Sequence, residues 1–385
     1  MVTIEKVSTK KQQREFLNFP LRMYKDNPCF VPPLYLDEKK IFNKNYIYND
    51  TCETVYFLAL RDGKTVGRIS GILQKASNEK RNEKRIRFTR FDAIDDVEVA
   101  KALFAALEEW GASLGMDAVC GPLGFSDLER EGLLIEGFEY LATFEEQYNA
   151  DYYGALIEAC GYRKEVDWLE SRVYPPAEKE AEEFDKMSKY LMQRYHLHMA
   201  EKKSVGKMID RYADELFDLL DVGYEKLYGT VPFTDRMKKT MISNFRLFIR
   251  KEDVELVLDE NDKLVCMGLG FPSLGEALVH SSGRLTPLRL FKLIRAMRHP
   301  KVIDMGLIAV DPAYLNKGIS AVMCDRIVKM MKNRGLEYCE TNLNLEDNFA
   351  IRNMWKRFPT LQHKRRRSYV KEIGVKEGAE SGEGV

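Results

Sequence analysis

The 385-residue chain carries the same order of local sequence patterns twice. Residues 54–73 alternate apolar and polar side chains around Asp62-Gly63, a dipeptide that readily adopts the positive φ angles of a tight hairpin turn. Residues 253–271 alternate in the same way around a second polar turn. In each half a strand, an amphipathic helix and another strand follow. Two copies of one αβ unit are therefore predicted.

Two offsets align the halves. A shift of 220 positions places Gly115 on Gly335, the glycines at which the two predicted helices end. A shift of 199 positions places Lys64 on Lys263. Because few residues are identical, the repeat rests on the order and spacing of the elements. One large α/β domain with coincidental similarity is the alternative.

The repeat predicts the division of the chain. The first copy spans residues 1–176, and a polar helix at residues 177–195 connects it to the second copy at residues 196–373. The last segment, residues 374–385, has few apolar side chains to bury and is expected to be a disordered tail.

Composition excludes several classes of protein. Lysine plus arginine equals aspartate plus glutamate at 60 each, so no overall charge favours DNA. Seven cysteines without a C-x-x-C pair argue against a disulfide framework and indicate a reducing cytoplasm. No signal peptide and no apolar run long enough for a membrane span are apparent, and the histidines lack metal-site spacing.

A strand-to-helix turn in the second half is a candidate anion site. The β-rich residues 302–310 are followed by Asp311-Pro312, then by Gly318 and a helix. Backbone N–H groups at the positive end of a helix bind a pyrophosphate, and glycine lets the backbone approach closely. Lys317 would add a cation. A plain structural turn is the alternative.

The order of elements and this turn resemble the GNAT superfamily of acetyl-CoA-dependent N-acetyltransferases. That family opens the helix after its fourth strand with Q/R-x-x-G-x-G/A, and here the pattern falls on Leu315, Gly318 and Ser320. The resemblance extends to bacterial tandem GNAT proteins. It implies an α/β fold of two GNAT-like domains, each a twisted, mixed, mainly antiparallel sheet flanked by helices.

The resemblance implies acetyl-CoA or another acyl-CoA as substrate, and no metal. Asn348 matches an asparagine that contacts the pantetheine arm in the family, although it would also serve as a helix N-cap. Trp355 stands where the family has its tyrosine acid, so Tyr314, Tyr338 and Tyr369 are open alternatives. The implied acyl-CoA-binding residues are Ile308, Val310, Leu315, Asn316, Lys317, Gly318, Ile319, Ser320 and Asn348.

Two acidic residues are candidate catalytic bases. Asp304 lies in the predicted fourth strand, where some family members carry a carboxylate, and alternation places it on one face with Gly306 and Ile308. Glu340 is the second candidate and shares a face of the next strand with two asparagines, at positions 342 and 344. Solvated strand faces are the alternative for both.

The first copy departs from the family pattern. Asp95, Asp96 and Glu98 occupy its phosphate-loop position. These carboxylates would repel a pyrophosphate, but they suit a helix N-terminus. The first copy is therefore expected to lack cofactor binding.

Two basic segments have structural interpretations. Residues 283–300 predict an inserted amphipathic helix that packs on the sheet and exposes a basic face. Residues 364–367, KRRR, predict the charged edge of a terminal strand, with contact to a ribose phosphate as the alternative.

The resemblance implies an acyltransferase in which a primary amine of a small molecule or peptide attacks the thioester directly. A non-catalytic acyl-CoA-binding or interaction module stays open, as does a transferase that uses aminoacyl-tRNA. Self-association as a homodimer is also open.

Overall fold

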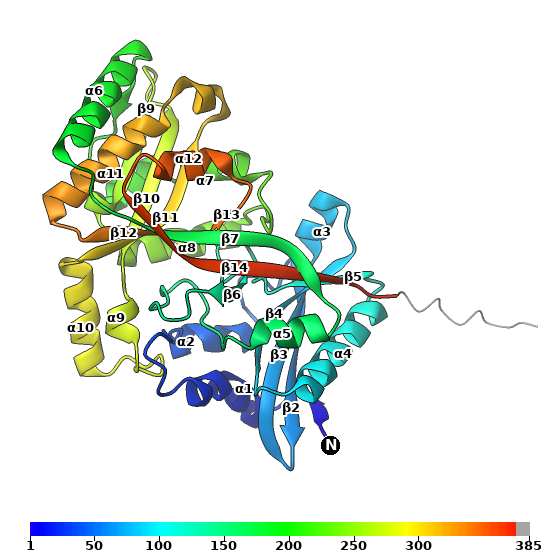
Figure 1. Cartoon of the computed structure of the whole chain (residues 1–385). Helices are drawn as coiled ribbons and strands as arrows, with labels where there is room; N and C mark the ends of the chain where they lie inside the picture. Colours follow the sequence, from blue (N-terminus) through cyan, green and yellow to red (C-terminus); the bar gives the residue numbers. More distant parts are fainter. Residues whose placement is uncertain (375–385) are drawn as a thin grey trace, which may run out of the picture.

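The computed structural model describes residues 1–374, without the side chains at 247 and 248. The predicted tail at residues 374–385 therefore lies, apart from Gly374, outside the described residues. Figure 1 shows two lobes joined by two long strands that cross the middle of the molecule.

The first half contains the expected order of elements. Asp62 and Gly63 have φ angles of 50° and 73°, which confirms the predicted hairpin turn. The elements are β1 (Thr3–Lys6), α1 (Lys10–Met23), α2 (Tyr35–Glu38), β2 (Cys52–Arg61), β3 (Lys64–Gln74), α3 (Lys75–Arg81), β4 (Arg85–Ala93), α4 (Val97–Ser113), β5 (Ala118–Gly121), β6 (Leu133–Glu136), α5 (Tyr153–Ala159) and β7 (Arg163–Val173).

The second half repeats this order after α6 (Glu178–Arg194). Gly335 ends its long helix in the left-handed conformation, as Gly115 does near the end of α4. The elements are β8 (His198–Met199), α7 (Val205–Tyr224), α8 (Asp235–Phe248), β9 (Val254–Leu258), β10 (Leu264–Pro272), α9 (Gly275–Leu278), α10 (Pro287–Arg298), β11 (Val302–Val310), α11 (Ser320–Arg334), β12 (Tyr338–Thr341), β13 (Asn344–Leu345), α12 (Phe349–Trp355) and β14 (Thr360–Glu372).

All the strands belong to one continuous sheet. Its order is β1-β2-β3-β4-β5-β14-β7-β12-β11-β10-β9-β8, with β13 and β6 paired to β7 and β14. The pairs β4/β5 and β11/β12 are parallel and all others are antiparallel. This architecture confirms a mixed, mainly antiparallel sheet flanked by helices.

The two halves exchange their last strands. β7, from the end of the first half, pairs with β12, and β14, from the end of the second half, pairs with β5. β7 and β14 also pair with each other, and they are the two strands that join the lobes in Figure 1. Each half therefore completes its sheet with a strand of the other.

The exchange corrects the prediction for residues 364–367. β14 lies in the middle of the sheet and not at an edge, so Lys364 and Arg366 are fully buried. The Arg366 guanidinium donates to the Glu170 carboxylate over 2.6 Å, and the Lys364 ammonium lies 3.4 Å from the same carboxylate. Buried charges of this kind persist only when they are paired and hydrogen-bonded.

The segment between β10 and β11 also crosses between the halves. It forms α9 and α10, the helices at the lower left of Figure 1. Leu278 of α9 and Leu293 of α10 are buried in the same cluster as Phe30 and Val31 of the first half. None of the helices described is both long and apolar enough to traverse a bilayer.

Candidate functional site

β11 and β12 separate in the middle of the second half. They pair in parallel from Val302 to Met305, after which β11 continues alone on that side to Val310. β12 ends at Thr341, and the following residues form β13, which pairs with β7. The predicted single strand is thus divided, because β13 draws the chain away from β11. Glu340, Asn342 and Asn344 consequently do not share one strand face.

A β-bulge at Gly306 accompanies this separation. Met305 pairs with Gly270 and Leu307 with Leu269, so Gly306 has no partner in the ladder. Ile303, Met305 and Ile308 pack in clusters with α11, whereas Leu307 packs with α7. The expectation that Asp304 and Ile308 share a face is therefore wrong, since the extra residue reverses the alternation.

Tyr224, the last residue of α7, occupies the backbone edge left open on β11. Its hydroxyl accepts from the Ile308 N–H over 3.3 Å and donates to the Ile308 carbonyl over 3.1 Å. Burial raises the pKa of Tyr224 to about 12, so the phenol is a neutral donor. Sequence reasoning missed Tyr224, which is 84 residues from its partner.

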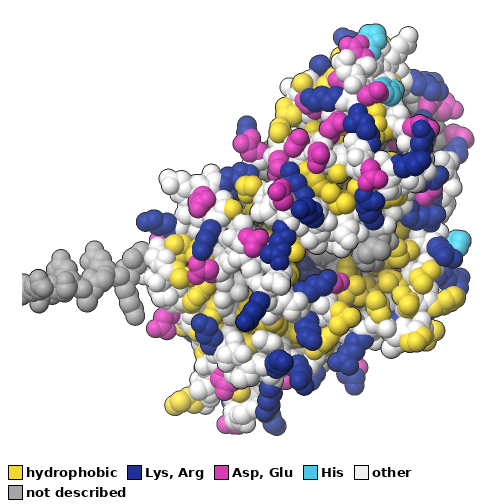
Figure 2. Space-filling view, turned by 180° about the vertical axis from the view of Figure 1, so that it is seen from behind, with side chains coloured by type: hydrophobic (Ala, Val, Ile, Leu, Met, Phe, Trp, Pro, Cys, Tyr) yellow, Lys and Arg dark blue, Asp and Glu magenta, His cyan; other side chains and the backbone are white. Residues whose placement is uncertain are grey.

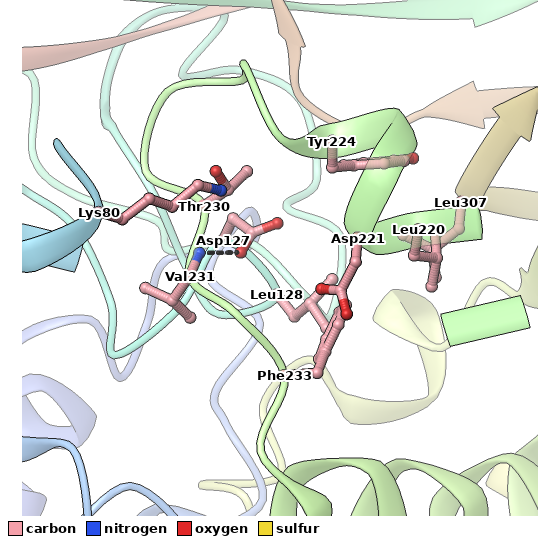
Figure 3. Close-up of a pocket in the computed structure, with 10 residues that line it drawn as sticks. All are labelled: Lys80, Asp127, Leu128, Leu220, Asp221, Tyr224, Thr230, Val231, Phe233 and Leu307. Atoms are coloured by element: carbon pink, nitrogen blue, oxygen red, sulfur yellow. Dashed lines mark hydrogen bonds between the residues drawn. The ribbon is translucent and has the colours of Figure 1, made fainter. Parts of the chain in front are cut away.

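Tyr224 and Leu307 also line a small pocket between the two halves (Figure 3). Burial raises the pKa of Asp127 and of Asp221, whose carboxylates both line it. Leu307 lies two ladder positions from Asp304 on the same sheet face, a separation of about 7 Å. The other lining residues are Lys80, Leu128, Leu220, Thr230, Val231 and Phe233.

Asp304 and Glu340 lie side by side. The parallel register pairs them directly, and both are almost completely buried. Neither oxygen of Asp304 has a hydrogen-bond partner of good geometry among the described residues, although the Ser273 side chain lies close enough to oppose the rise of its pKa. Glu340 bonds to His363 Nε2 and lies 3.5 Å from Arg172 Nε. The structure thus brings the two predicted acids together. It buries both carboxyl groups, whereas a solvated strand face would have exposed them.

These two acids belong to a largely buried group of charges that Tyr140 and Gln147 contact, which we call the seam cluster. It contains five carboxylates, four permanent cations and one histidine. Within the part of the chain that the structure describes, its atoms without a hydrogen-bond partner include Glu145 Oε2, Glu146 Oε2 and His363 Nδ1. The members are Arg130, Glu145, Glu146, Glu170, Arg172, Asp304, Glu340, His363, Lys364 and Arg366.

The seam cluster shifts the pKa values of its carboxyl groups in opposite directions. Burial, together with Glu145 and Glu340, raises the pKa of Asp304 well above its usual range. Burial likewise raises the pKa of Glu146 to about 8. Arg366 and Lys364 outweigh the effect of burial at Glu170 and lower its pKa to about 2. Unpaired carboxyls beside paired ones are typical of sites that bind a polar ligand.

The turn before α11 is the predicted anion site, and it packs beside Leu191 of α6. Gly318 has a φ angle of 78° and is exposed, and no side chain in the described part of the chain caps the N-terminus of α11. Lys317 Nζ lies 4.4 Å from the centre of the Tyr314 ring. Leu315 and Asn316 are exposed, while Ile319 is fully buried and anchors the turn.

Asn348 and Trp355 have structural contacts. The Asn348 side chain accepts from the Ile351 N–H over 3.4 Å and caps α12, which is the N-cap alternative considered above. Trp355 is buried and donates to Asn344 Oδ1 over 2.7 Å. Of the tyrosines considered in its place, Tyr369 is buried in the core of the first half.

The first half arranges the equivalent positions differently. Asp96 caps α4 by accepting from the Glu98 N–H over 2.8 Å, and Arg61 pairs with both acids. By strand register, Arg87 and Cys120 stand where the second half has Asp304 and Glu340. Within residues 1–374, no group of three His, Cys, Asp or Glu side chains could hold a metal ion.

The site and fold can be compared with known proteins. No family model matches the chain. It is 27% identical to Protein YghO of Escherichia coli K12 over 382 residues, covering 94% of each chain. It is 26% identical over 297 residues to a protein of Caulobacter vibrioides named bacterial ceramide synthase, covering 75% of this chain and 74% of that one.

Solved structures match the fold at low identity. A tandem GNAT protein from the clavulanic acid biosynthesis pathway gives a TM-score of 0.54 at 11% identity, covering 97% of this chain and 99% of that one. A glucosamine N-acetyltransferase region of a fungal β-N-acetylglucosaminidase also gives 0.54 at 11%, covering 96% of this chain and 38% of that one. The chain therefore has the tandem GNAT fold.

Proposed function

We propose that the chain is an acyltransferase that moves an acyl group from acyl-CoA to a primary amine by direct attack. The observation that carries the proposal is the position of Asp304. Its carboxyl group is buried beside the point where β11 and β12 separate, and it has no hydrogen-bond partner of good geometry among the described residues. A purely structural carboxyl group would be expected to have one.

The donor is assigned to the turn before α11 and the open edge of β11. The uncapped N-terminus of α11, with Gly318 and Ser320, would hold the pyrophosphate through backbone N–H groups. The pantetheine arm would then run between the separated strands along Ile308 and Val310. There the Ile308 N–H, once released from the Tyr224 hydroxyl, would polarise the thioester carbonyl.

The acceptor is assigned to the seam cluster. Glu145 and Glu340 lie near Asp304 and oppose its ionisation, so an ammonium ion that enters beside these groups would offset their repulsion and favour the carboxylate form of Asp304. Asp304 would take one proton from that ammonium, since its raised pKa makes its carboxylate a stronger base. Glu340, held by His363, is the second choice of base.

The reaction balances with Tyr224 as the acid. The free amine attacks the thioester carbon, and the C–S bond breaks as the amide forms. Tyr224 would give its proton to the departing thiolate and recover one from the amide nitrogen. Asp304 would release its proton to solvent afterwards.

The relative named bacterial ceramide synthase favours a particular pair of substrates. A ceramide is the fatty acid amide of a long-chain amino alcohol. We therefore favour a long-chain amine as the acceptor and a fatty acyl-CoA as the donor.

Non-catalytic binding of acyl-CoA is the second candidate. It is favoured by Tyr224, which already bonds to both polar groups of Ile308 at the place assigned to the thioester. A chain of this kind would bind acyl-CoA without transferring the acyl group.

Calorimetric titration and thiol release separate the two candidates. The chain is titrated with acetyl-CoA, fatty acyl-CoAs and free CoA, and thiol release is then followed with small amines, peptides and long-chain amino alcohols. We expect tighter binding of fatty acyl-CoA and amine-dependent release. Binding without release from any amine would favour the second candidate, and no binding of any CoA ligand would contradict both.

A further inference from the structure

The exposed side of α10 is unusually apolar. Five of the fifteen large hydrophobic side chains that are exposed in the described residues lie between positions 285 and 294. Leu288 and Phe291 are 65% and 62% exposed, although neighbouring Leu293 is buried in the core. The prediction of a solvated basic face is thus incomplete, because apolar side chains occupy much of it.

The apolar surface extends onto the first half. Tyr35 donates its backbone N–H to the Gly283 carbonyl over 2.9 Å, and the Arg284 guanidinium lies 5.1 Å from the Tyr35 ring. These contacts bring Leu36, which is 76% exposed, next to the start of the α10 segment. Leu36, Leu285, Leu288, Leu290, Phe291 and Ile294 are named here the α10 patch.

Uncompensated positive charge surrounds the α10 patch. No carboxylate occurs between residues 277 and 303, whereas that stretch contains six lysines and arginines. Among the described residues, only Lys301 of these six forms an ion pair, with Glu337. Figure 2 shows apolar side chains with lysine and arginine beside them at the lower right, on the side where α10 lies. The five unpaired cations are Arg284, Arg289, Lys292, Arg295 and Arg298.

We propose that the α10 patch docks on an anionic lipid bilayer surface. An apolar helix face rimmed by arginine and lysine is the pattern of helices that lie in the interface, with the apolar side chains among the acyl chains and the cations at the phosphates. The charge of the rim fits a negative surface and decides against a neutral apolar partner. This proposal does not depend on the acyl transfer proposed above.

Docking of α10 would bring the membrane to within about 20 Å of the Asp304 backbone, the longest span of six residues. Asp304 follows Arg298, the last residue of α10, by only six positions. A surface-bound enzyme would meet lipid substrates at the bilayer, where they are concentrated.

Vesicle co-sedimentation of the whole chain tests the proposal. We expect binding to vesicles in which about a third of the lipid is phosphatidylglycerol and much weaker binding to pure phosphatidylcholine. Leu288→Ser with Phe291→Ser should reduce binding by about tenfold or more, because it removes apolar side chains from the bilayer. Arg295→Gln with Arg298→Gln should reduce it by roughly fivefold per charge.

A matched control uses exposed apolar residues elsewhere. Met187 and Tyr190 of α6 are 46% and 53% exposed, and α6 lies at the top of Figure 1, well above α10. Met187→Ser with Tyr190→Ser should bind vesicles like the unchanged chain. Thermal melting establishes that each variant is folded.

Three results would overturn the proposal. The first is no binding of the unchanged chain to anionic vesicles, and the second is equal binding by the folded Leu288→Ser, Phe291→Ser variant. The third is a dimer in light scattering that this variant converts to a monomer while vesicle binding is absent, which would make the α10 patch a contact between two copies of the chain. None of these results depends on catalysis, so the proposed reaction would be tested separately.

Discussion

The two strand pairs β4/β5 and β11/β12 occupy equivalent places in the two halves, but their polar groups are satisfied differently. On β4, the Arg87 guanidinium donates to the carbonyls of Gly124 and Gly229 and to the Ser77 hydroxyl. On β11, Asp304 stands at the same register position and has no hydrogen-bond partner of good geometry among the described residues.

The helices that follow these strands, α4 and α11, also differ in how their polar groups are satisfied. Asp96 caps α4, whereas no side chain of the described residues caps α11. At this register position and at this helix start, the first half satisfies its polar groups with its own side chains, and the described part of the second half does not. Unpaired buried groups reduce stability, so the unpaired carboxyl group of Asp304 supports the proposed site in the second half.

Asp304→Asn should have the largest effect of the changes considered, and this effect should be on catalysis. If Asp304 is the base, this change should lower kcat by about a hundredfold to ten-thousandfold, while the Kd for acyl-CoA stays unchanged. Steady-state kinetics and calorimetry measure the two quantities. Stability should not fall, since the amide resembles the protonated carboxyl group that its raised pKa favours.

Arg87→Gln is the matched change in the first half. It leaves three buried acceptors without their charged donor, so we expect a loss of unfolding free energy of about 1–3 kcal/mol. Its effect on kcat should be small. Full turnover by Asp304→Asn would remove that residue as the base and leave Glu340.

Paired and unpaired carboxyl groups should lose their contributions to stability at opposite ends of the pH scale. Arg90 outweighs the burial of Glu38 on α2 and lowers its pKa to about 2, so its contribution to stability is present above its usual pKa of 4.5 and is lost as pH falls toward 2. The pKa of Glu146 is raised to about 8, so its contribution is present below pH 4.5 and is lost as pH rises toward 8.

Glu146→Gln tests the alkaline side of this contrast. The unfolding free energy of the variant should be close to that of the unchanged chain at about pH 5. At about pH 8 it should be higher by roughly a few kcal/mol. Urea unfolding at several pH values measures the difference. A variant that is less stable than the unchanged chain at both pH values would mean that Glu146 is ionised and paired.

The contrast between α4 and α11 predicts an intermediate effect on affinity. Ser320→Glu places a carboxylate in the first turn of α11, as Glu98 does in the first turn of α4, and should weaken acyl-CoA binding by about tenfold to a hundredfold through repulsion of the pyrophosphate. Glu98→Ser in α4 should leave binding unchanged. Calorimetry would contradict the assigned phosphate site if Ser320→Glu bound acyl-CoA normally.

Local structure was predictable from the sequence because local geometry requires particular residues. Asp62 and Gly63 adopt the positive φ angles of a tight turn, and Gly115 and Gly335 adopt those of a helix end. The strand exchange could not be predicted, since the patterns of β7 and β14 do not specify which half each strand joins. That is why Lys364 and Arg366 were expected at an edge.

The site was predictable only where it follows a strand pattern. The positions of Asp304 and Glu340 could be inferred from their strands, but the bulge at Gly306 changed the face of Ile308. Tyr224 and His363 enter the site from distant parts of the chain, through contacts that only the tertiary structure creates. A histidine beside four basic residues carries no sequence signal for a bond to Glu340.

The smallest predicted effect concerns the cap of α4. Asp96→Ala removes the acceptor of the Glu98 N–H and should lower the unfolding free energy by about 1 kcal/mol, the usual contribution of an N-cap. The pairing of Asp96 with Arg61 should add little, because that ion pair lies at the surface. Urea unfolding measures the loss, and acyl-CoA affinity should be unchanged. A variant with normal stability but altered acyl-CoA binding would instead place a ligand at α4, and the first half would then share the chemistry assigned here to the second.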